Sequence, residues 1–538
     1  MLDQKQDRYR EQEESSTQQR AAILGLNYLD SRGLPQKSEL VTDILSNHDM
    51  YTGHLVPLRA GDDRESTVFG ITSSTPQSLI RKLRAQYEES SSTLEFVMIS
   101  GAGFKEFMTR FDPPKKVVYD DVKIAKEGDS DTLESVSQTL ESVRTDDILD
   151  YLIEQANMLS ASDIHIENQR EHVRIRFRVH GMLHPIAHLT HDKYRVLQAS
   201  IASKANISTA STDAQSGHMQ HVPKAHPEEL INMRIETIPT NYGQDAVIRL
   251  FNYDEDLLKL KNLGLNEARE AEIADLITHP HGMLMVVGPT GSGKSTTLYS
   301  ILSELNDPSR KILTLEDPVE MTLAGISQIP VNTTKGDSFG EKLRAILRLD
   351  PDVVMVGEIR DADTAKTAIQ ASITGHLVLS TFHASSAAAA FARMIDMIGQ
   401  NPIFSNAIRM VIAQRLVRKL DDNTKKSYSP DETTKKWLKE NLGQLPDSYE
   451  TPDIDSVTLY NPGYSDDSPF GYSDRIMITE HLVVGESIQK FIRGDITEIS
   501  VSAIEEAAKA DGMLTMKQDG ILRVLRGETT LEEINRVL

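Results

Sequence analysis

Apolar and polar residues alternate with two different periods along this chain, and the changes of period divide it into modules. Residues 67–71 (TVFGI) and 94–100 (LEFVMIS) have the pattern of strands, and residues 78–87 between them repeat apolar positions at helical spacing. We therefore predict a small α/β module over residues 21–114. The twenty residues before it are polar, and we expect them to be loose.

A second module begins with apolar positions at helical spacing between Ile148 and Leu159. Four segments with strand-like alternation follow, at residues 163–167, 173–179, 231–238 and 245–251. This order predicts an α+β domain. Residues 126–142 are acidic and almost without large apolar side chains, so we predict a linker before the domain.

The third module runs from about residue 263 to 420 and alternates short apolar segments with helical ones. The apolar segments are residues 283–287, 312–315, 353–356 and 377–380. Strands that alternate with helices predict a doubly wound, mostly parallel sheet. A polar stretch at 421–469 interrupts the pattern, and we expect the tail from residue 471 to be largely helical.

Composition narrows the function classes. The 538 residues include 58 Lys and Arg against 80 Asp and Glu, and this net charge of −22 disfavours a protein whose whole surface binds nucleic acid. With no cysteine, disulfides and thiolate metal sites are excluded. The N-terminus lacks the apolar core of a secretory signal, and no apolar run approaches the roughly 20 residues that span a bilayer. We expect a soluble, cytoplasmic chain.

One glycine-rich segment carries the clearest chemistry. Residues 288–295 (GPTGSGKS) match the pattern G-x-x-x-x-G-K-[ST] and lie between a predicted strand and a predicted helix, which is the context that a phosphate-binding loop requires. Lys294 would reach the β- and γ-phosphates, and the Ser295 hydroxyl would bind Mg²⁺. The alternative is a glycine-rich turn without a ligand. The candidate nucleotide-binding residues are Gly288, Thr290, Gly291, Ser292, Gly293, Lys294, Ser295 and Thr296.

A phosphate-binding loop hydrolyses nothing without carboxylates for the metal and the water. The segment LEDPVE offers Glu316, Asp317 and Glu320, and Glu358 follows four apolar residues of a later strand. That position beside the phosphates is typical of a metal-holding carboxylate. The alternative is that these residues cap the ends of strands and helices.

Two histidines flank the segment LVLSTF. The odd spacing of His376 and His383 puts them on opposite faces of a strand, which disfavours a zinc pair. One of them could sense the γ-phosphate; the alternative is a hydrogen-bonded core histidine.

Several long strings together resemble one family, the ring-forming ATPases of type II secretion and type IV pilus assembly. The strings are ASDIHIE, RIRFRVHG, GPTGSGKSTTLYS, ILTLEDPVE, LRAILRLDPDVVMVGEIRDADTAKTAIQASITGHLVLSTFHA and DGMLTMKQDGILRVLRGETTLEEINRV. They cover about residues 144–538. The resemblance implies an α/β fold in which a P-loop (RecA-like) doubly wound domain follows a smaller α+β domain and a variable N-terminal α/β domain.

On this basis we predict five segments along the chain. They are a variable N-terminal domain for partner docking (1–125), a linker (126–143), the α+β domain (144–255), the P-loop ATPase core (256–420) and a C-terminal subdomain (421–538) whose part 421–470 lacks cysteine.

The resemblance also implies roles for single residues. Glu316 would activate water, and Glu358 would hold Mg²⁺ together with Ser295. Arg234 and Arg249 of the smaller domain would reach the phosphates, where a guanidinium offsets the charge of the transferring phosphoryl group. His376 and His383 fall in the conserved histidine segment of the family. The alternative for each arginine is a surface strand residue.

The sequence departs from the family at a metal site. Many assembly-type members bind zinc through two cysteine pairs, and this chain has Asp421, Thr424, Tyr464 and Asp467 at or near those positions. We therefore expect no zinc. The smaller domain also has His180 where the family often has Asp, and Gln244 where it often has Glu.

The resemblance implies an ATP- and Mg²⁺-dependent motor that works as a homohexamer. We expect it to power assembly of a type IV pilus or pseudopilus at the cytoplasmic face of the inner membrane, peripherally, through a membrane platform protein and without nucleic acid. The alternatives are a type II secretion motor of the same family, a nucleotide-binding scaffold with little turnover, and a nucleic-acid translocase, which the acidic charge disfavours.

Overall fold

The computed structural model describes residues 2–30, 32, 41, 44–60, 66–89, 93–111, 136–140, 143, 147–223, 230–251, 255–333, 336–443, 445–465, 468 and 470–538. The chain forms two compact units, Met1–Val118 and Tyr119–Leu538. Most of the predicted linker lies outside the described residues. Its described part is helical at 136–140, and Val136, Leu140 and Val143 are buried in the core of the module that follows.

The first unit is the predicted small α/β module. Its four-stranded sheet has the order β1-β4-β3-β2. The predicted strands β3 and β4 pair in parallel, and the helix α3 connects them along the chain. Its elements are α1 (Leu2–Leu24), β1 (Asn27–Tyr28), α2 (Asn47–Gly53), β2 (Leu55–Ala60), β3 (Ser66–Ile71), α3 (Gln77–Glu89), β4 (Thr93–Met98) and α4 (Gly101–Phe111).

The prediction of a loose N-terminus is wrong, because α1 is a helix that packs on this sheet. Glu14 is 1% exposed, and its carboxylate accepts hydrogen bonds from the Tyr28 hydroxyl (2.7 Å) and the Ser100 hydroxyl (2.8 Å). Ala21 is buried as well. Arg10 of the same helix pairs with Glu106 of α4. Because polar contacts and a small side chain hold the helix, it shows no apolar stripe for sequence analysis to detect.

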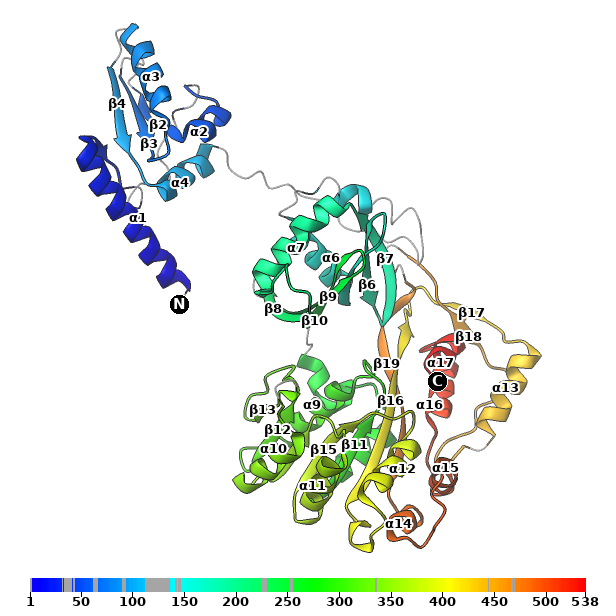
Figure 1. Cartoon of the computed structure of the whole chain (residues 1–538). Coiled ribbons are helices and arrows are strands. Elements are labelled where there is room, and N and C mark those ends of the chain that lie inside the picture. Colours follow the sequence, from blue (N-terminus) through cyan, green and yellow to red (C-terminus); the bar gives the residue numbers. More distant parts are fainter. Residues whose placement is uncertain are drawn as a thin grey trace. The chain divides into compact units, whose positions relative to one another are not determined.

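The second unit begins with a six-stranded antiparallel sheet in the order β7-β6-β5-β10-β9-β8, and α6 and α7 bury their apolar side chains against one face (Figure 1). All four predicted strands are present. The elements are α6 (Ile148–Met158), β5 (Ala161–Asn168), β6 (Val173–Val179), β7 (Met182–Leu189), α7 (His191–Ala205), β8 (Gln215–His221), β9 (Ile231–Thr240) and β10 (Gly243–Phe251). The other face carries the polar alternate positions of these strands.

A seven-stranded sheet follows, in the order β13-β12-β14-β15-β11-β16-β19. Its strands are parallel except for the last pair, and helices cover both faces, with α8 and α9 on one and α10, α11 and α12 on the other. The elements are α8 (Glu267–Ile277), β11 (Gly282–Val287), α9 (Lys294–Leu305), β12 (Ile312–Glu316), β13 (Ser327–Pro330), α10 (Phe339–Ile346), β14 (Val353–Val356), α11 (Ala362–Ile373), β15 (Leu377–Phe382) and α12 (Ala387–Ile398).

The tail differs from the prediction because it opens with a long strand. This strand, β19, pairs antiparallel with β16 along almost its whole length and completes the seven-stranded sheet. Helices follow it, as expected. The elements are β16 (Ile408–Leu420), β17 (Lys426–Tyr428), α13 (Glu432–Leu442), β18 (Leu459–Asn461), β19 (Tyr472–Val483), α14 (Glu486–Arg493), α15 (Val501–Ala510), α16 (Met516–Leu525) and α17 (Leu531–Val537).

One aromatic side chain ties the cysteine-free segment to the six-stranded module. Phe470, just before β19, is buried in the core of that module, and its ring centroid lies 4.1 Å from that of His184 on β7. Burial and the nearby Arg418 cation lower the pKa of His184 to about 4, and burial lowers the pKa of His180 to about 4 as well. Both imidazoles are therefore uncharged at neutral pH.

We expect Phe470→Ala to release this segment from the six-stranded module. Loss of a buried phenyl ring costs about 3–5 kcal/mol when the cavity cannot collapse. Differential scanning calorimetry should show a lower transition temperature, and limited proteolysis should cut faster between residues 421 and 470. The matched control is Tyr428→Ala, because Tyr428 is an exposed aromatic residue of the same subdomain. Equal cleavage of both variants would contradict this role for Phe470.

Candidate functional site

The phosphate-binding loop follows a completely buried strand, β11, and leads directly into α9. Gly293 caps the helix with φ +86°, a left-handed conformation that favours glycine. At Gly288 a Cβ atom would lie 2.5 Å from the Ser292 hydroxyl oxygen and 2.7 Å from the Gln414 carbonyl oxygen. The predicted strand-loop-helix context is therefore present, with backbone N–H groups at the start of a helix available to an anion.

Lys294 is folded back on its own loop. Its Nζ donates to the carbonyl oxygens of Gly288 (3.0 Å) and Pro289 (2.8 Å). Burial lowers its pKa, and the Glu358 carboxylate works against that shift. Both acceptors are carbonyl oxygens of the loop itself. When a nucleotide binds, the charged amine can exchange these carbonyl oxygens for phosphate oxygens.

The register of the parallel strands brings the other predicted groups to the edge of the sheet where this loop lies. Val287 pairs with Phe382, so His383 follows at the level of the loop. Val356 at the end of β14 pairs with Leu315, which places Glu358 and Glu316 at that edge too. Ligand sites of parallel α/β sheets lie at the carboxyl ends of strands.

Glu358 is held from two sides. One carboxylate oxygen lies 3.2 Å from His383 Nε2, and the other lies 2.7 Å from a terminal nitrogen of Arg360. The carboxylate raises the pKa of Arg360 through this hydrogen bond. His383 therefore positions the predicted metal-binding carboxylate, a contact that its sequence position alone did not reveal.

Glu316 lies in a different environment, because it is 4% exposed and surrounded by donors. Its carboxylate accepts hydrogen bonds from the Tyr299 hydroxyl, the Thr314 hydroxyl (2.5 Å) and Gln328 Nε2 (3.0 Å). Burial and this carboxylate both raise the pKa of Tyr299. These three donors engage both oxygens of the Glu316 carboxylate, so the contacts favour a structural role over the activation of water.

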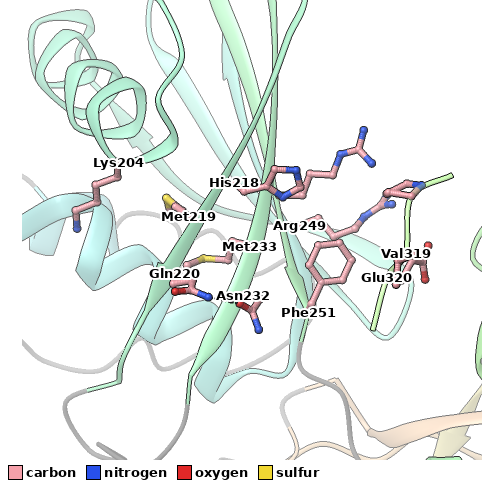
Figure 2. A pocket seen from close by; sticks show the side chains of 12 residues that line it. Lys204, His218, Met219, Gln220, Asn232, Met233, Arg249, Phe251, Val319 and Glu320 are labelled. Carbon is pink, nitrogen blue, oxygen red and sulfur yellow. Dashed lines mark hydrogen bonds between the residues drawn. The ribbon is translucent and has the colours of Figure 1, made fainter. Parts of the chain in front are cut away.

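Glu320, from the same LEDPVE segment, shares a cavity with both predicted arginines. The cavity has a volume of about 460 Å³ and is lined by Arg234, Arg249, His218 and Phe251 of the six-stranded module and by Pro318, Val319 and Glu320 (Figure 2). The two arginines form a directly opposed pair on β9 and β10. The structure thus brings Arg234 and Arg249 together and faces them with the segment that follows β12.

Both arginines are anchored by carboxylates on their own sheet. Arg249 Nε donates to Asp163 at 3.0 Å, and Arg234 Nε donates to Glu236 at 2.6 Å. Their side chains are 54% and 34% exposed. Anchoring through Nε leaves the terminal nitrogens of each guanidinium free to point outward, as a phosphate ligand requires.

His376 is not brought to this site. It precedes β15, at the opposite end of the strand from His383, and its Nδ1 lies 3.0 Å from the Ala371 carbonyl oxygen. The six residues of β15 separate the two histidines by about 20 Å. Within one chain, His376 matches the alternative of a hydrogen-bonded histidine.

Sequence reasoning missed the residues that support the loop from below. Gln414 Nε2 donates to the Ser292 carbonyl (2.7 Å), and its Oε1 accepts from the Thr297 hydroxyl (3.0 Å). The next residue, Arg415, lies 3.2 Å from the ideal Cβ position of Gly288, and burial lowers its pKa. A glutamine and an arginine inside the apolar segment RMVIAQRLV were the available signal.

Gln244, one of the departures from the family, has a structural role. It is buried, its Oε1 accepts from Gln198 at 2.6 Å and its Nε2 donates to the Thr237 hydroxyl at 3.2 Å. The amide therefore accepts one hydrogen bond and donates another inside this module.

The residues at the loop fit a nucleotide with magnesium. The Ser292 hydroxyl oxygen is buried and has no hydrogen-bond partner within the described ranges. Magnesium takes one or two protein oxygens together with phosphates and water, so Ser295 and Glu358 suffice as a protein ligand set. No group of three or more His, Asp or Glu residues that could hold a metal ion occurs in the described part of the chain.

Fold and loop together define a P-loop nucleotide-binding protein of the parallel α/β class. The chain belongs to the Type II/IV secretion system protein family, which it matches over residues 139–536. As a member of this family of secretion and pilus ATPases, it is an ATPase.

Curated relatives carry two kinds of name. Type II secretion system protein E of Xanthomonas campestris pv. campestris is 37% identical over 396 residues, which cover 72% of this chain and 66% of that protein. The protein of the same name in Dickeya dadantii is 38% identical over 392 residues, which cover 72% of this chain and 75% of that protein. The type IV pilus assembly ATPase PilB of Thermus thermophilus is 36% identical over 72% of this chain, which spans only 42% of that longer protein.

Solved structures confirm the fold. The ATPase DotB of Legionella pneumophila superposes with a TM-score of 0.53 at 23% identity, over 72% of this chain and 94% of that one. DotB of Yersinia pseudotuberculosis gives a TM-score of 0.52 at 19% identity, over 74% and 93%. Among the helices that the structure describes, none is long and apolar enough to cross a bilayer.

Proposed function

We propose that this chain is an ATP-driven motor that assembles a type IV pilus or a related pseudopilus filament. The observation that supports it concerns Glu320 in the segment after β12: it lines one cavity with Arg234 and Arg249, and its charge also acts on Lys294 of the phosphate-binding loop. Hydrolysis at such a site depends on how closely the two sheets approach each other, so hydrolysis is coupled to their relative movement.

In the proposed reaction, water attacks the γ-phosphate of ATP in line, and ADP and phosphate leave. Backbone N–H groups of the loop and Lys294 bind the phosphates, while Arg234 and Arg249 offset the charge of the transferring group. Bound Mg²⁺, held by Ser295 and Glu358, would neutralise phosphate charge. His383 keeps the Glu358 carboxylate oriented through their 3.2 Å contact.

The water-activating role passes from Glu316 to Glu320 in this proposal. The three donors on Glu316 occupy its oxygens, whereas Glu320 lines the cavity with both arginines. From that cavity the Glu320 carboxylate can orient a water for attack.

The motor would act as a homohexamer at the cytoplasmic face of the inner membrane. A membrane platform protein would receive the work, and the unit Met1–Val118 would dock to a partner. We propose no nucleic-acid partner, because the net charge is −22. Zinc remains unexpected, because the chain has no cysteine.

A second candidate is the motor of a type II secretion system. The relatives named type II secretion system protein E favour it, at 37–38% identity over about the same residues as the pilus relative. Both candidates share the ATPase site and the membrane-side task, and they differ in the filament that is assembled.

Phosphate release from Mg-ATP across a range of protein concentrations tests the proposed motor. We expect specific activity to rise with concentration, because a ring forms by association, and we expect Lys294→Ala to abolish turnover. Near-normal turnover by Lys294→Ala would contradict the phosphate-binding assignment. Specific activity that does not change with concentration would contradict activation by assembly.

Paired glutamate variants separate the two carboxylate roles. We expect Glu320→Gln to slow turnover at least about 100-fold while the chain still binds ATP, which is the loss typical of a missing general base. Glu316→Gln should instead lower the unfolding temperature, because its buried hydrogen bonds are disturbed. Glu304→Gln, an exposed change on α9, is the control. Full activity in Glu320→Gln, with turnover abolished in a stable Glu316→Gln, would reverse the assignment.

A further inference from the structure

A histidine extends the row of arginines across the six-stranded sheet. His218 on β8 pairs directly with Arg234 on β9, and Arg234 pairs directly with Arg249 on β10. Directly opposed residues of an antiparallel sheet project from the same face. The three side chains therefore stand in one line, about 5 Å apart from strand to strand.

The same three residues line the 460 Å³ cavity with Glu320. Figure 2 shows His218 and Arg249 near each other, on the side of the strands where the segment with Val319 and Glu320 passes. His218 has no role in the reaction proposed above. Its side chain is exposed and its neighbours on the same strand are buried.

The charges around His218 come from every element packed near it. Arg234 and Glu236 face it from β9, Arg249 from β10, Lys204 from α7 and Glu320 from the segment after β12. Glu236 on β9 is engaged by Arg234, and Lys204 is engaged by Asp150 of α6. A third positive charge at this position would have no carboxylate of the cavity except Glu320 to neutralise it.

We propose that His218 is a third phosphate-binding group of the nucleotide site, which contacts the polyphosphate beside Arg234 and does so most strongly when its imidazole is protonated. The proposal rests on the proposed function, because it takes the cavity to be the place where the arginines meet the nucleotide. It makes His218 a residue that sets how tightly ATP is held at a given pH.

The direction of the pH effect follows from the chemistry. Histidine is the side chain whose charge changes between about pH 5 and pH 8, and it is a cation on the acid side of that range. A charge-assisted hydrogen bond to phosphate strengthens binding about tenfold relative to the neutral ring. ATP affinity should therefore decrease as the pH rises through this range.

The test is calorimetric titration of the full chain with Mg²⁺ and a non-hydrolysable ATP analogue at about pH 6 and pH 8, on either side of the imidazole pKa. Wild type should lose about tenfold in affinity between the two, beyond the change seen in His218→Asn. His218→Arg should bind tightly at both values, because its guanidinium stays charged. Protonation of the nucleotide itself is common to all variants and cancels in the comparison.

The variant Lys294→Ala distinguishes failure of the His218 inference from failure of the proposed function. If this variant loses binding while His218→Asn follows the wild-type pH profile, His218 has no phosphate role and the inference fails alone. If Lys294→Ala binds as well as wild type, the loop is not the nucleotide site and the proposed function fails with it. Unfolding temperatures of the His218 variants should match wild type, because the residue is exposed.

Discussion

In the proposed mechanism, the charge of a bound polyphosphate is met from two sheets at once, and this requirement accounts for the placement of charged groups in the second unit. The parallel sheet offers backbone N–H groups and Lys294, which in the structure binds carbonyl oxygens of its own loop. The antiparallel sheet offers Arg234 and Arg249, each anchored through Nε to a carboxylate of the same sheet. Neither set alone surrounds a transferring phosphoryl group.

The two sides of the site differ in rigidity for a physical reason. Strands of the seven-stranded sheet are buried on both faces, and the loop is supported by Gln414, so its geometry is fixed by packing. The arginine row stands on the outer face of a sheet that is buried on its helix-covered face only. A site composed of one fixed part and one outward-facing part is suited to transmit domain movement, which is what a motor needs.

The local sequence pattern was enough to predict a site residue wherever its position is set by the strand that precedes it. The loop after β11 and the carboxylate after β14 follow from strand ends, and the structure has both. The arginines were expected only from the resemblance to the family, and the structure places them as an opposed pair on β9 and β10. The packing of helix α1 could not be predicted, because it depends on polar contacts to distant residues, those of Glu14 with Tyr28 and Ser100 and the pair of Arg10 with Glu106. The strand β19 depends on pairing with β16 across more than fifty residues, which no local pattern encodes.

Within the site, sequence reasoning failed where contacts are tertiary. The burial of Glu316 under Tyr299 and Gln328, and the placement of Glu320 in the arginine cavity, depend on how the segment LEDPVE turns after β12. The two histidines illustrate the same limit. Their spacing correctly disfavoured a metal pair, but only strand direction shows that His383 reaches Glu358 and that His376 lies about a strand length away.

The central claim is that the arginines and the loop of one chain serve the same nucleotide. The most direct measurement mixes chains that carry Lys294→Ala with chains that carry Arg234→Ala and Arg249→Ala, and follows phosphate release from Mg-ATP. Since Arg234, Arg249 and Glu320 of a single chain line one cavity, and the charge of Glu320 acts on Lys294 of the same chain, we expect the mixture to stay as inactive as each variant alone. Recovery of turnover on mixing would contradict it, because the arginines would then complete the site of a neighbouring chain.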